Sequence, residues 1–495
     1  MGIAFKKMTL RAIATSSLRC LTLGSALTAL AATPAWSHAS DKGFVLLLPT
    51  HYYIVGGTLA VAASFLLLLA VPDGFLRRIA TARLDLGVWP ALPRTAISAA
   101  SFLLLVLLLI AGVYGSRDPL SNPLPLFIWT VWWGGLTVAQ ALFGNLWRFL
   151  NPWLAPYRLI RRLSGDTGSS PGFLGYPPWF GYGPAILLFL GFAWFELIDP
   201  APDDPARLAE AILIYSAITL AGMVLFGERA WLAKGDGFTV FFRFVALLAP
   251  LRAEPVEPDA EAGPSRRYRL TLGLPGRALL QFGPLPLSGA LFVLLTLATV
   301  SFDGLDKTFW WLGVWGVNPL EFPGRTVLMP ANSLGLIGAW LLLGAAYGLA
   351  MGLGGRLAGS RIDIGTLLGA FVLSILPISI GYHFAHYLTS FLVNAQYAVF
   401  SIDDPFGWGW HLLGIADPHV RVSFLSDMNS VWLIFSAQAG AVVLVHILAV
   451  LLAHLIAIER FPDKRAALAS QWPLALLMIG YTLFGLWLLA APTIG

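Results

Sequence analysis

Long apolar stretches separated by short polar segments dominate the chain after its first forty residues. Each stretch holds about 20 residues, enough for an α-helix to cross a hydrocarbon core at a rise of 1.5 Å per residue. This pattern predicts an all-α polytopic membrane protein with about ten transmembrane helices. The expected spans are approximately 52–72, 95–114, 124–143, 182–198, 207–226, 284–301, 331–353, 365–391, 431–455 and 472–491.

The first residues have the pattern of a cleaved secretory signal peptide. Lysines and arginines precede a short apolar segment at 20–32, and small residues follow it, among them Ser37 and Ala39. This order of basic, apolar and small residues is typical of a signal that is cleaved after export. We therefore expect residues 1–39 to be the signal and residues 40–495 to form a single integral-membrane helical domain.

Composition and charge agree with a membrane protein of defined orientation. The chain is 57% hydrophobic and 12% charged, whereas soluble domains are about 25% charged. If the N-terminus is exported, the loops expected inside hold 21 lysines and arginines and those expected outside hold 6. This bias predicts a bacterial inner-membrane protein with both termini periplasmic. It also explains the basic balance of the chain without a nucleic-acid partner.

One inner segment, 227–283, differs from the other loops. It contains an apolar run at 238–250, which we expect to lie as a helix in the cytoplasmic interface with Arg243 extending toward the headgroups. An acidic, proline-rich linker follows at 254–262.

Histidines in two spans are the main candidates for chemistry. The eighth span carries a polar stripe at helical spacing, and its two histidines lie one turn apart. Pro377 is expected to kink this span beside a cavity. Ionisable side chains inside a membrane are costly and usually mark a site. The stripe consists of Ser379, His383, His386, Ser390 and Asn394.

A third histidine, His446 of the ninth span, is placed to face the eighth span. We expect His383, His386 and His446 to bind a divalent metal ion, zinc or a similar ion, in the outer half of the membrane. Asp427, or a neighbouring carboxylate, is the candidate general base. Glu196, near the outer end of the fourth span, is a further candidate functional residue.

Other uses of these histidines remain open. His411, His419 and His454 are expected to make structural hydrogen bonds. In a haem- or metal-binding redox protein, His383 and His446 would be axial ligands on adjacent helices. In a metal or small-molecule transporter, the polar stripe would line the path. The chain has no Walker phosphate loop, no GxSxG elbow and no CxxCH motif, and its only cysteine, Cys20, lies in the expected signal.

Several sequence runs resemble bacterial integral-membrane proteins known as fenitrothion hydrolases, which are organophosphorus triester hydrolases. The similar runs are scattered over nearly all of residues 40–495. They are GFVLLLPTHYYIVGG at 43–57, SRDPLSNPLPLFIWTVWW at 116–133, LWRFLNPW at 146–153, SFDGLDKTFWWLGVWGVNPLEFPGR at 301–325 and GYHFAHYLTSFLVNAQYA at 381–398.

The resemblance implies metal-assisted hydrolysis of the P–O–aryl bond of an organophosphorus triester. A bound metal ion would activate water and polarise the phosphoryl oxygen. An apolar triester partitions into the lipid bilayer and could reach a periplasmic site from the outer leaflet. The protein partners of the chain do not follow from its sequence.

Overall fold

The computed structural model describes residues 45–165, 172–256, 267–321, 323–415, 419–461 and 463–493. The expected signal peptide, residues 1–39, lies outside these residues, as does most of the acidic linker. The described residues all belong to the expected integral-membrane domain.

The predicted all-α membrane architecture is confirmed. Ten helical segments in the described ranges are long and apolar enough to cross a membrane. Seven of them are single helices: α2 (Thr50–Ala70), α4 (Arg94–Tyr114), α10 (Pro205–Phe226), α14 (Leu287–Leu305), α16 (Arg325–Leu357), α19 (Met428–Arg460) and α20 (Lys464–Ala490). The chain is thus a multi-pass membrane protein.

The other three spans combine different helix types. The third joins α5 (Pro123–Pro125), the π-helix η2 (Leu126–Leu136) and α6 (Thr137–Phe143), and the fourth joins the 3₁₀-helix η3 (Pro178–Phe180) to α9 (Gly183–Leu197). The eighth consists of α17 (Ile364–Phe371), the 3₁₀-helix η7 (Val372–Ile375) and α18 (Leu376–Asp403).

Proline explains the interruption in the eighth span. Pro377 lies in the first turn of α18, where its missing N–H costs no helical hydrogen bond. The tighter 3₁₀ turn of η7 ends immediately before α18. The predicted break at Pro377 is therefore present, and it falls between two helical parts of one span.

Short helices occupy several connections between the spans. They are η1 (Val45–Leu47), α3 (Asp73–Thr81), α7 (Trp147–Leu150), α8 (Leu154–Leu163), α11 (Glu228–Ala230), η4 (Trp231–Gly235), α12 (Gly237–Val245), η5 (Ala246–Leu248), α13 (Arg277–Leu280), α15 (Phe309–Val314), η6 (Pro319–Glu321) and η8 (Ser423–Leu425).

Aspartates fix the first residues of several long helices. Asp204, Asp427 and Asp463 precede α10, α19 and α20, and each carboxylate accepts a hydrogen bond from a backbone N–H in the first turn. The first N–H groups of a helix lack partners within it, so an N-terminal carboxylate stabilises the end. These helices consequently begin at sequence-defined positions.

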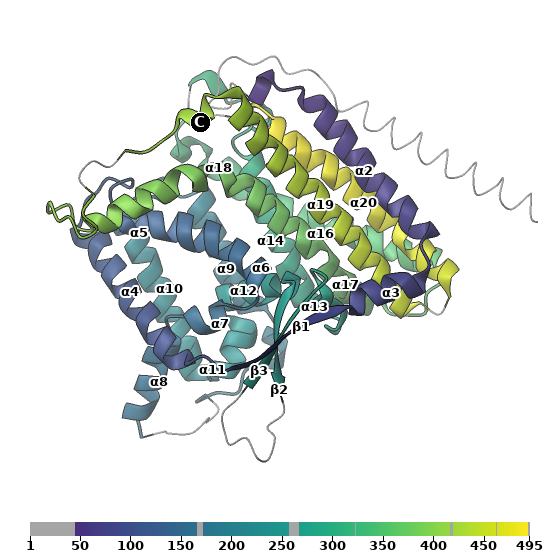
Figure 1. Ribbon diagram of the computed structural model, residues 1–495, viewed down its shortest axis with the longest axis horizontal. Helices are drawn as coiled ribbons and strands as arrows, with labels where there is room; N and C mark the ends of the chain where they lie inside the picture. Colours follow the sequence, from purple (N-terminus) through teal and green to yellow (C-terminus); the bar gives the residue numbers. More distant parts are fainter. Residues whose placement is uncertain are drawn as a thin grey trace, which may run out of the picture. The chain divides into compact units, whose positions relative to one another are not determined.

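The helices pack around a buried centre formed by α14 and α18. Helices α2, α19 and α20 run side by side (Figure 1). Helix α18 lies against α19 on one side and against the π-helix η2 on another, and α14 contacts α9, α16 and α18. This arrangement brings polar residues of α9, α14 and α18 together inside the bundle.

Helix α12, which the sequence predicts at the cytoplasmic interface, is covered by other helices of the bundle. Seven of its nine residues are buried, and its aromatic rings pack into the bundle. The ring centroid of Phe238 lies 4.5 Å from that of Trp132, and Phe241 lies 5.2 Å from Phe189. Aromatic partners on other helices cover this apolar segment, while Arg243 Nη2 lies 3.4 Å from the Tyr182 hydroxyl.

A small antiparallel sheet, which the sequence analysis did not anticipate, joins two distant loops. Its order is β1–β3–β2, with bounds Arg83–Pro90, Arg267–Gly273 and Leu251–Val256 respectively. Strand β1 leads into α4, and β3 comes shortly before α14. The sheet therefore lies at the end of the bundle where these two helices begin (Figure 1). We call this end of the bundle the sheet end, and the end where α9 and α14 finish the cavity end.

Candidate functional site

Two neighbouring cavities lie toward the cavity end of the bundle. The larger has a volume of about 180 Å³ and the smaller about 20 Å³. Four residues line both: Glu196, Leu197, Asp303 and Tyr387. Because three of these four side chains are polar, the boundary between the cavities is a candidate functional site.

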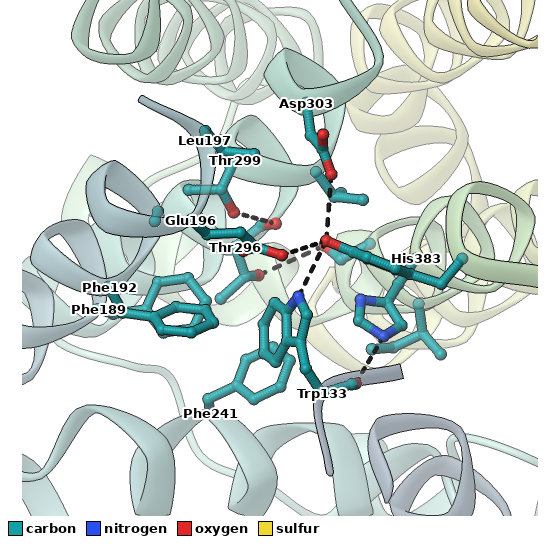
Figure 2. Close-up of a pocket in the computed structure, with 15 residues that line it drawn as sticks. Trp133, Phe189, Phe192, Glu196, Leu197, Phe241, Thr296, Thr299, Asp303 and His383 are labelled. Atoms are coloured by element: carbon teal, nitrogen blue, oxygen red, sulfur yellow. Dashed lines mark hydrogen bonds between the residues drawn. The ribbon is translucent and has the colours of Figure 1, made fainter. Parts of the chain in front are cut away.

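The Tyr387 hydroxyl is the centre of this boundary. It accepts a hydrogen bond from Trp133 Nε1 at 3.0 Å and lies 3.1 Å from Asp303 Oδ2. It also makes a short hydrogen bond with Glu196 Oε1. Figure 2 shows Asp303, Glu196 and Trp133 converging from three sides on this point. Helices α9, α14 and α18 and the π-helix η2 therefore meet at one hydroxyl group.

Asp303 is a buried carboxylate with two nitrogen partners. His386 Nε2 lies 2.8 Å from Asp303 Oδ2, and Lys307 Nζ lies 3.4 Å from Asp303 Oδ1. The Asp303 residue is only 4% exposed, and an unpaired charge at such a position would be strongly destabilising. The histidine and the lysine supply the compensation that allows a carboxylate at this depth.

Arg325, the first residue of α16, holds the end of α9 in place. Its Nη1 donates hydrogen bonds to the backbone carbonyls of Glu196 at 2.9 Å and Asp199 at 3.3 Å. The last carbonyls of a helix lack helical partners, and a cationic side chain there satisfies them. Arg325 also lines the larger cavity, so it both fixes the Glu196 backbone and adds positive charge to the wall.

The residues that follow α14 add further charge at the edge of the site. Burial and the neighbouring carboxylate of Asp303 raise the pKa of Asp306 to about 7, although Lys307 opposes the shift. Asn332 Nδ2 donates to Asp306 Oδ2 at 3.3 Å. The carboxylate of Asp303 raises the pKa of Lys307 above its ordinary value. Lys307 is therefore a cation at neutral pH.

The polar stripe predicted on the eighth span does face these cavities. Ser379 and His383 line the smaller cavity, while His386, Ser390 and Asn394 line the larger one. Helical spacing was sufficient to identify this face because one side of α18 turns toward the cavities along several turns.

The three histidines expected to share a metal ion have different partners. His383 Nε2 lies 2.9 Å from the Trp133 carbonyl oxygen (Figure 2), and His446 Nδ1 lies 2.7 Å from the Val442 carbonyl oxygen of its own helix. His386 instead meets Asp303. No group of three His, Cys, Asp or Glu side chains suited to a metal ion occurs among the described residues. The donor set predicted for zinc therefore does not fit a metal ion in this arrangement.

Asp427, the candidate base, is an exposed helix cap. Its Oδ2 accepts hydrogen bonds from the Ser430 N–H at 2.9 Å and from the Ser430 hydroxyl at 2.8 Å. These hydrogen bonds lower the pKa of Asp427. Asp427 lines neither of the two cavities, so the structure separates it from the histidines of α18.

The sequence indicated Glu196 and His386 but missed Asp303, Lys307 and Tyr387. Span six was expected to end at residue 301, before its acidic residue, whereas α14 continues to Leu305. An aspartate four residues before a lysine at the end of an apolar span was the available signal, because such a pair can share one helix face. Nothing in the sequence pattern marked Tyr387 as a site residue except its position next to His386.

Comparison with known proteins does not assign the chain to a family: no family model matches it, and no curated protein or solved structure does.

Proposed function

We propose that this membrane protein hydrolyses phosphoric triesters in its larger cavity, with His386 as the general base. The observation that carries the proposal is the pair formed by His386 and buried Asp303 in the wall of a polar cavity. The contact between His386 Nε2 and Asp303 Oδ2 measures 2.8 Å. A histidine oriented by a carboxylate is a recurrent means of activating a nucleophile.

The Asp303 contact sets the protonation pattern of the imidazole. When Nε2–H donates to Asp303, the lone pair of the neutral ring is on Nδ1. The His386 side chain is 29% exposed, so water in the cavity has access to the ring. Nδ1 takes a proton from water as the water oxygen attacks phosphorus, and the Asp303 carboxylate stabilises the imidazolium that forms.

The remaining walls of the cavity suit an uncharged phosphorus ester. Lys307 and Arg325 contribute positive charge, which stabilises negative charge developing on the phosphoryl oxygen. Trp129, Leu197 and Phe391 contribute apolar surface for an aryl or alkyl substituent. The same wall holds the carboxyl groups of Glu196, Asp203 and Asp303. Charges of both signs beside apolar surface support a neutral triester as the substrate class.

The resemblance of scattered sequence runs to fenitrothion hydrolases supports the same reaction. Apolar triesters dissolve in a bilayer, and the larger cavity lies toward one end of the membrane-spanning helices. The distribution of lysines and arginines favours a periplasmic cavity end in a bacterial inner membrane. We propose that substrate enters from the outer leaflet.

The proposal is tested with purified protein in detergent and a nitroaryl phosphotriester. We expect nitrophenolate release that persists after treatment with a chelator, because the base is supplied by the chain itself. Loss of release after chelation, with recovery on adding zinc, would instead favour the metal-assisted reaction. Absence of release from several triesters under all these conditions would contradict the hydrolase proposal.

A second candidate function is proton-linked transport of a small molecule. It is favoured by one observation: ionisable residues on three spans meet at the boundary between two cavities inside the bundle. Chains of such residues in membranes commonly carry protons. Proteoliposomes containing a pH-sensitive dye would show substrate-dependent proton flux that Asp303→Asn abolishes, whereas a hydrolase would show none.

A further inference from the structure

We infer that Glu196 carries a proton and acts as the general acid of the larger cavity, which suits substrates whose leaving group is a weakly acidic alcohol. This inference rests on the proposed hydrolase function and deepens it by naming the substrate class. It follows from the number of hydrogen atoms available at the Tyr387 hydroxyl.

The Tyr387 hydroxyl has one hydrogen atom and two lone pairs. Trp133 Nε1–H occupies one lone pair as a donor at 3.0 Å. The two remaining partners, Glu196 Oε1 and Asp303 Oδ2, are both carboxyl oxygens. A single hydroxyl hydrogen can serve only one of them, so the other contact is a hydrogen bond only if that carboxyl group supplies a hydrogen.

The other partners of the two carboxyl groups identify which one holds the proton. Asp303 receives His386 Nε2 at 2.8 Å and Lys307 Nζ at 3.4 Å, and nitrogen donors of this kind stabilise an ionised carboxylate. Glu196 faces the Tyr387 hydroxyl at the end of an apolar helix, with the neutral Trp133 indole beside it, and Lys307, which pairs with Asp303, attracts it only from a greater distance. The assignment that satisfies every contact has Glu196 donating to Tyr387 and Tyr387 donating to Asp303.

The larger cavity then contains a base and an acid in adjoining walls. Water attacks phosphorus and gives its proton to His386, while the bond from phosphorus to the leaving oxygen breaks with its electron pair on that oxygen. Glu196 donates its proton to the leaving oxygen, which departs as an alcohol. The second hydrogen of the attacking water stays on the product phosphodiester, which then releases it to solvent and becomes an anion. The proton on His386 returns to Glu196 through solvent, so one water is consumed per ester cleaved.

A general acid matters most when the leaving group is a poor one. A nitrophenolate departs as an anion without help, whereas an alkoxide needs protonation as it leaves. A cavity that holds a buried acid beside its base is therefore matched to alkyl or simple phenyl phosphotriesters. A nitroaryl phosphotriester would be an adventitious substrate of such a site.

The experiment measures hydrolysis of a phosphotriester series with nitrophenyl, phenyl and alkyl leaving groups. Glu196→Gln retains the size of the side chain and an N–H donor for Tyr387, so it is expected to fold. We expect its loss of rate to grow along the series and to reach about 10²–10⁴-fold for the alkyl ester. A loss of equal size for all three esters, or none for any, would overturn the inference.

An infrared measurement tests the location of the proton without requiring turnover. A carbonyl band of a protonated carboxylic acid should be present in the wild type, absent in Glu196→Gln and retained in Asp306→Asn, which controls for the buried carboxyl group of Asp306, whose pKa is raised to about 7. If Glu196→Gln elutes as aggregate, Tyr387→Phe replaces it and should shift the same band. A band unaffected by these variants would refute the assignment, even if the protein hydrolyses no triester.

Discussion

Helices α18 and α19 pack along each other, and each carries two buried or partly buried histidines, yet only one pair faces the cavities. On α18, His383 and His386 line the smaller and the larger cavity. On α19, His446 bonds to a carbonyl of its own helix, and His454 Nδ1 lies 3.0 Å from Gln471 Oε1 of α20. The difference arises from the neighbouring helices, because α14 provides a carboxylate to α18.

This comparison shows that depth and spacing do not determine the use of a histidine in a membrane. His383, His446 and His454 are all nearly inaccessible, but none of them pairs with a carboxylate in the part of the chain that the structure describes. His386 is more exposed and meets Asp303. The acceptor that α14 brings to His386 is what distinguishes it from the other three histidines of α18 and α19.

The largest expected effect distinguishes the two helices directly. His386→Ala removes the base and leaves Asp303 with one nitrogen partner fewer, so nitrophenolate release should fall by about 100-fold or more. His446→Leu, a substitution of similar volume, should change the rate by less than about threefold, because it removes only a bond within α19 and no charge. Equal losses in the two variants would remove the distinction between α18 and α19.

A smaller effect is expected from the hydroxyl groups of α18. Tyr387→Phe removes the hydroxyl that bridges Glu196 and Asp303 and should slow hydrolysis by roughly fivefold, since about 1 kcal/mol of positioning is lost. The matched control is Tyr382→Phe, whose hydroxyl donates to the backbone of Tyr481. The control should lose stability rather than activity, measured as a lower melting temperature at wild-type rate.

Substitutions of the buried histidine His454 of α19 should affect the stability of the protein and not its activity. His454→Leu leaves the Gln471 side-chain oxygen without its partner and should lower the free energy of unfolding by about 1 kcal/mol, with activity unchanged. Because replacing both partners of a buried hydrogen bond is often nearly neutral, His454→Leu combined with Gln471→Leu should recover most of that loss. Thermal unfolding in detergent measures both; a double variant weaker than the single would contradict the structural role.

The smallest effect concerns the rim of the cavity end and depends on pH. Burial opposes ionisation of Asp199, but the Arg207 guanidinium and the Ala201 N–H outweigh it and lower the pKa of Asp199. A lowered folded pKa gives stability that is present above the ordinary aspartate pKa of about 4 and lost as the pH falls through the folded value.

Asp199→Asn should therefore lose less stability than the wild type between neutral and acidic pH. The difference should be modest, because half of the Arg207 side chain is exposed to solvent. Melting temperatures measured as a function of pH would test this. Parallel curves for the two proteins would show that the ion pair does not contribute.

The fold was predictable from sequence wherever a continuous apolar run determines the position of a membrane-spanning helix. All ten spans were expected, because crossing a membrane requires a length that the sequence displays directly. The burial of α12 among other helices was not predicted, because an apolar helix of its length is equally compatible with an interface and with a bundle interior. The sheet was missed because β1 pairs with β3, a segment far away in the chain, and such a pairing leaves no local pattern in the sequence.

The site was predictable on α18 and, for Glu196, on α9, but not on α14. The stripe on α18 has a period, so His386, Ser390 and Asn394 could be assigned to one face. Asp303 belongs to a different helix, and no periodicity on α18 indicates which helix will face it. His446 shows the converse: it shares the depth expected for a ligand, but its rotation toward Val442 depends on packing.

The sheet at the other end of the bundle has a consequence for biosynthesis. Strand β1 is made after the first span, but its partner β3 follows the fifth span, and all eight residues of β1 are exposed even in the folded protein. During translation β1 therefore remains unpaired beside the membrane until four more spans have been inserted. Its glycine and its aspartate are residue types with low strand propensity, so β1 alone has a weak tendency to pair with other segments during that interval.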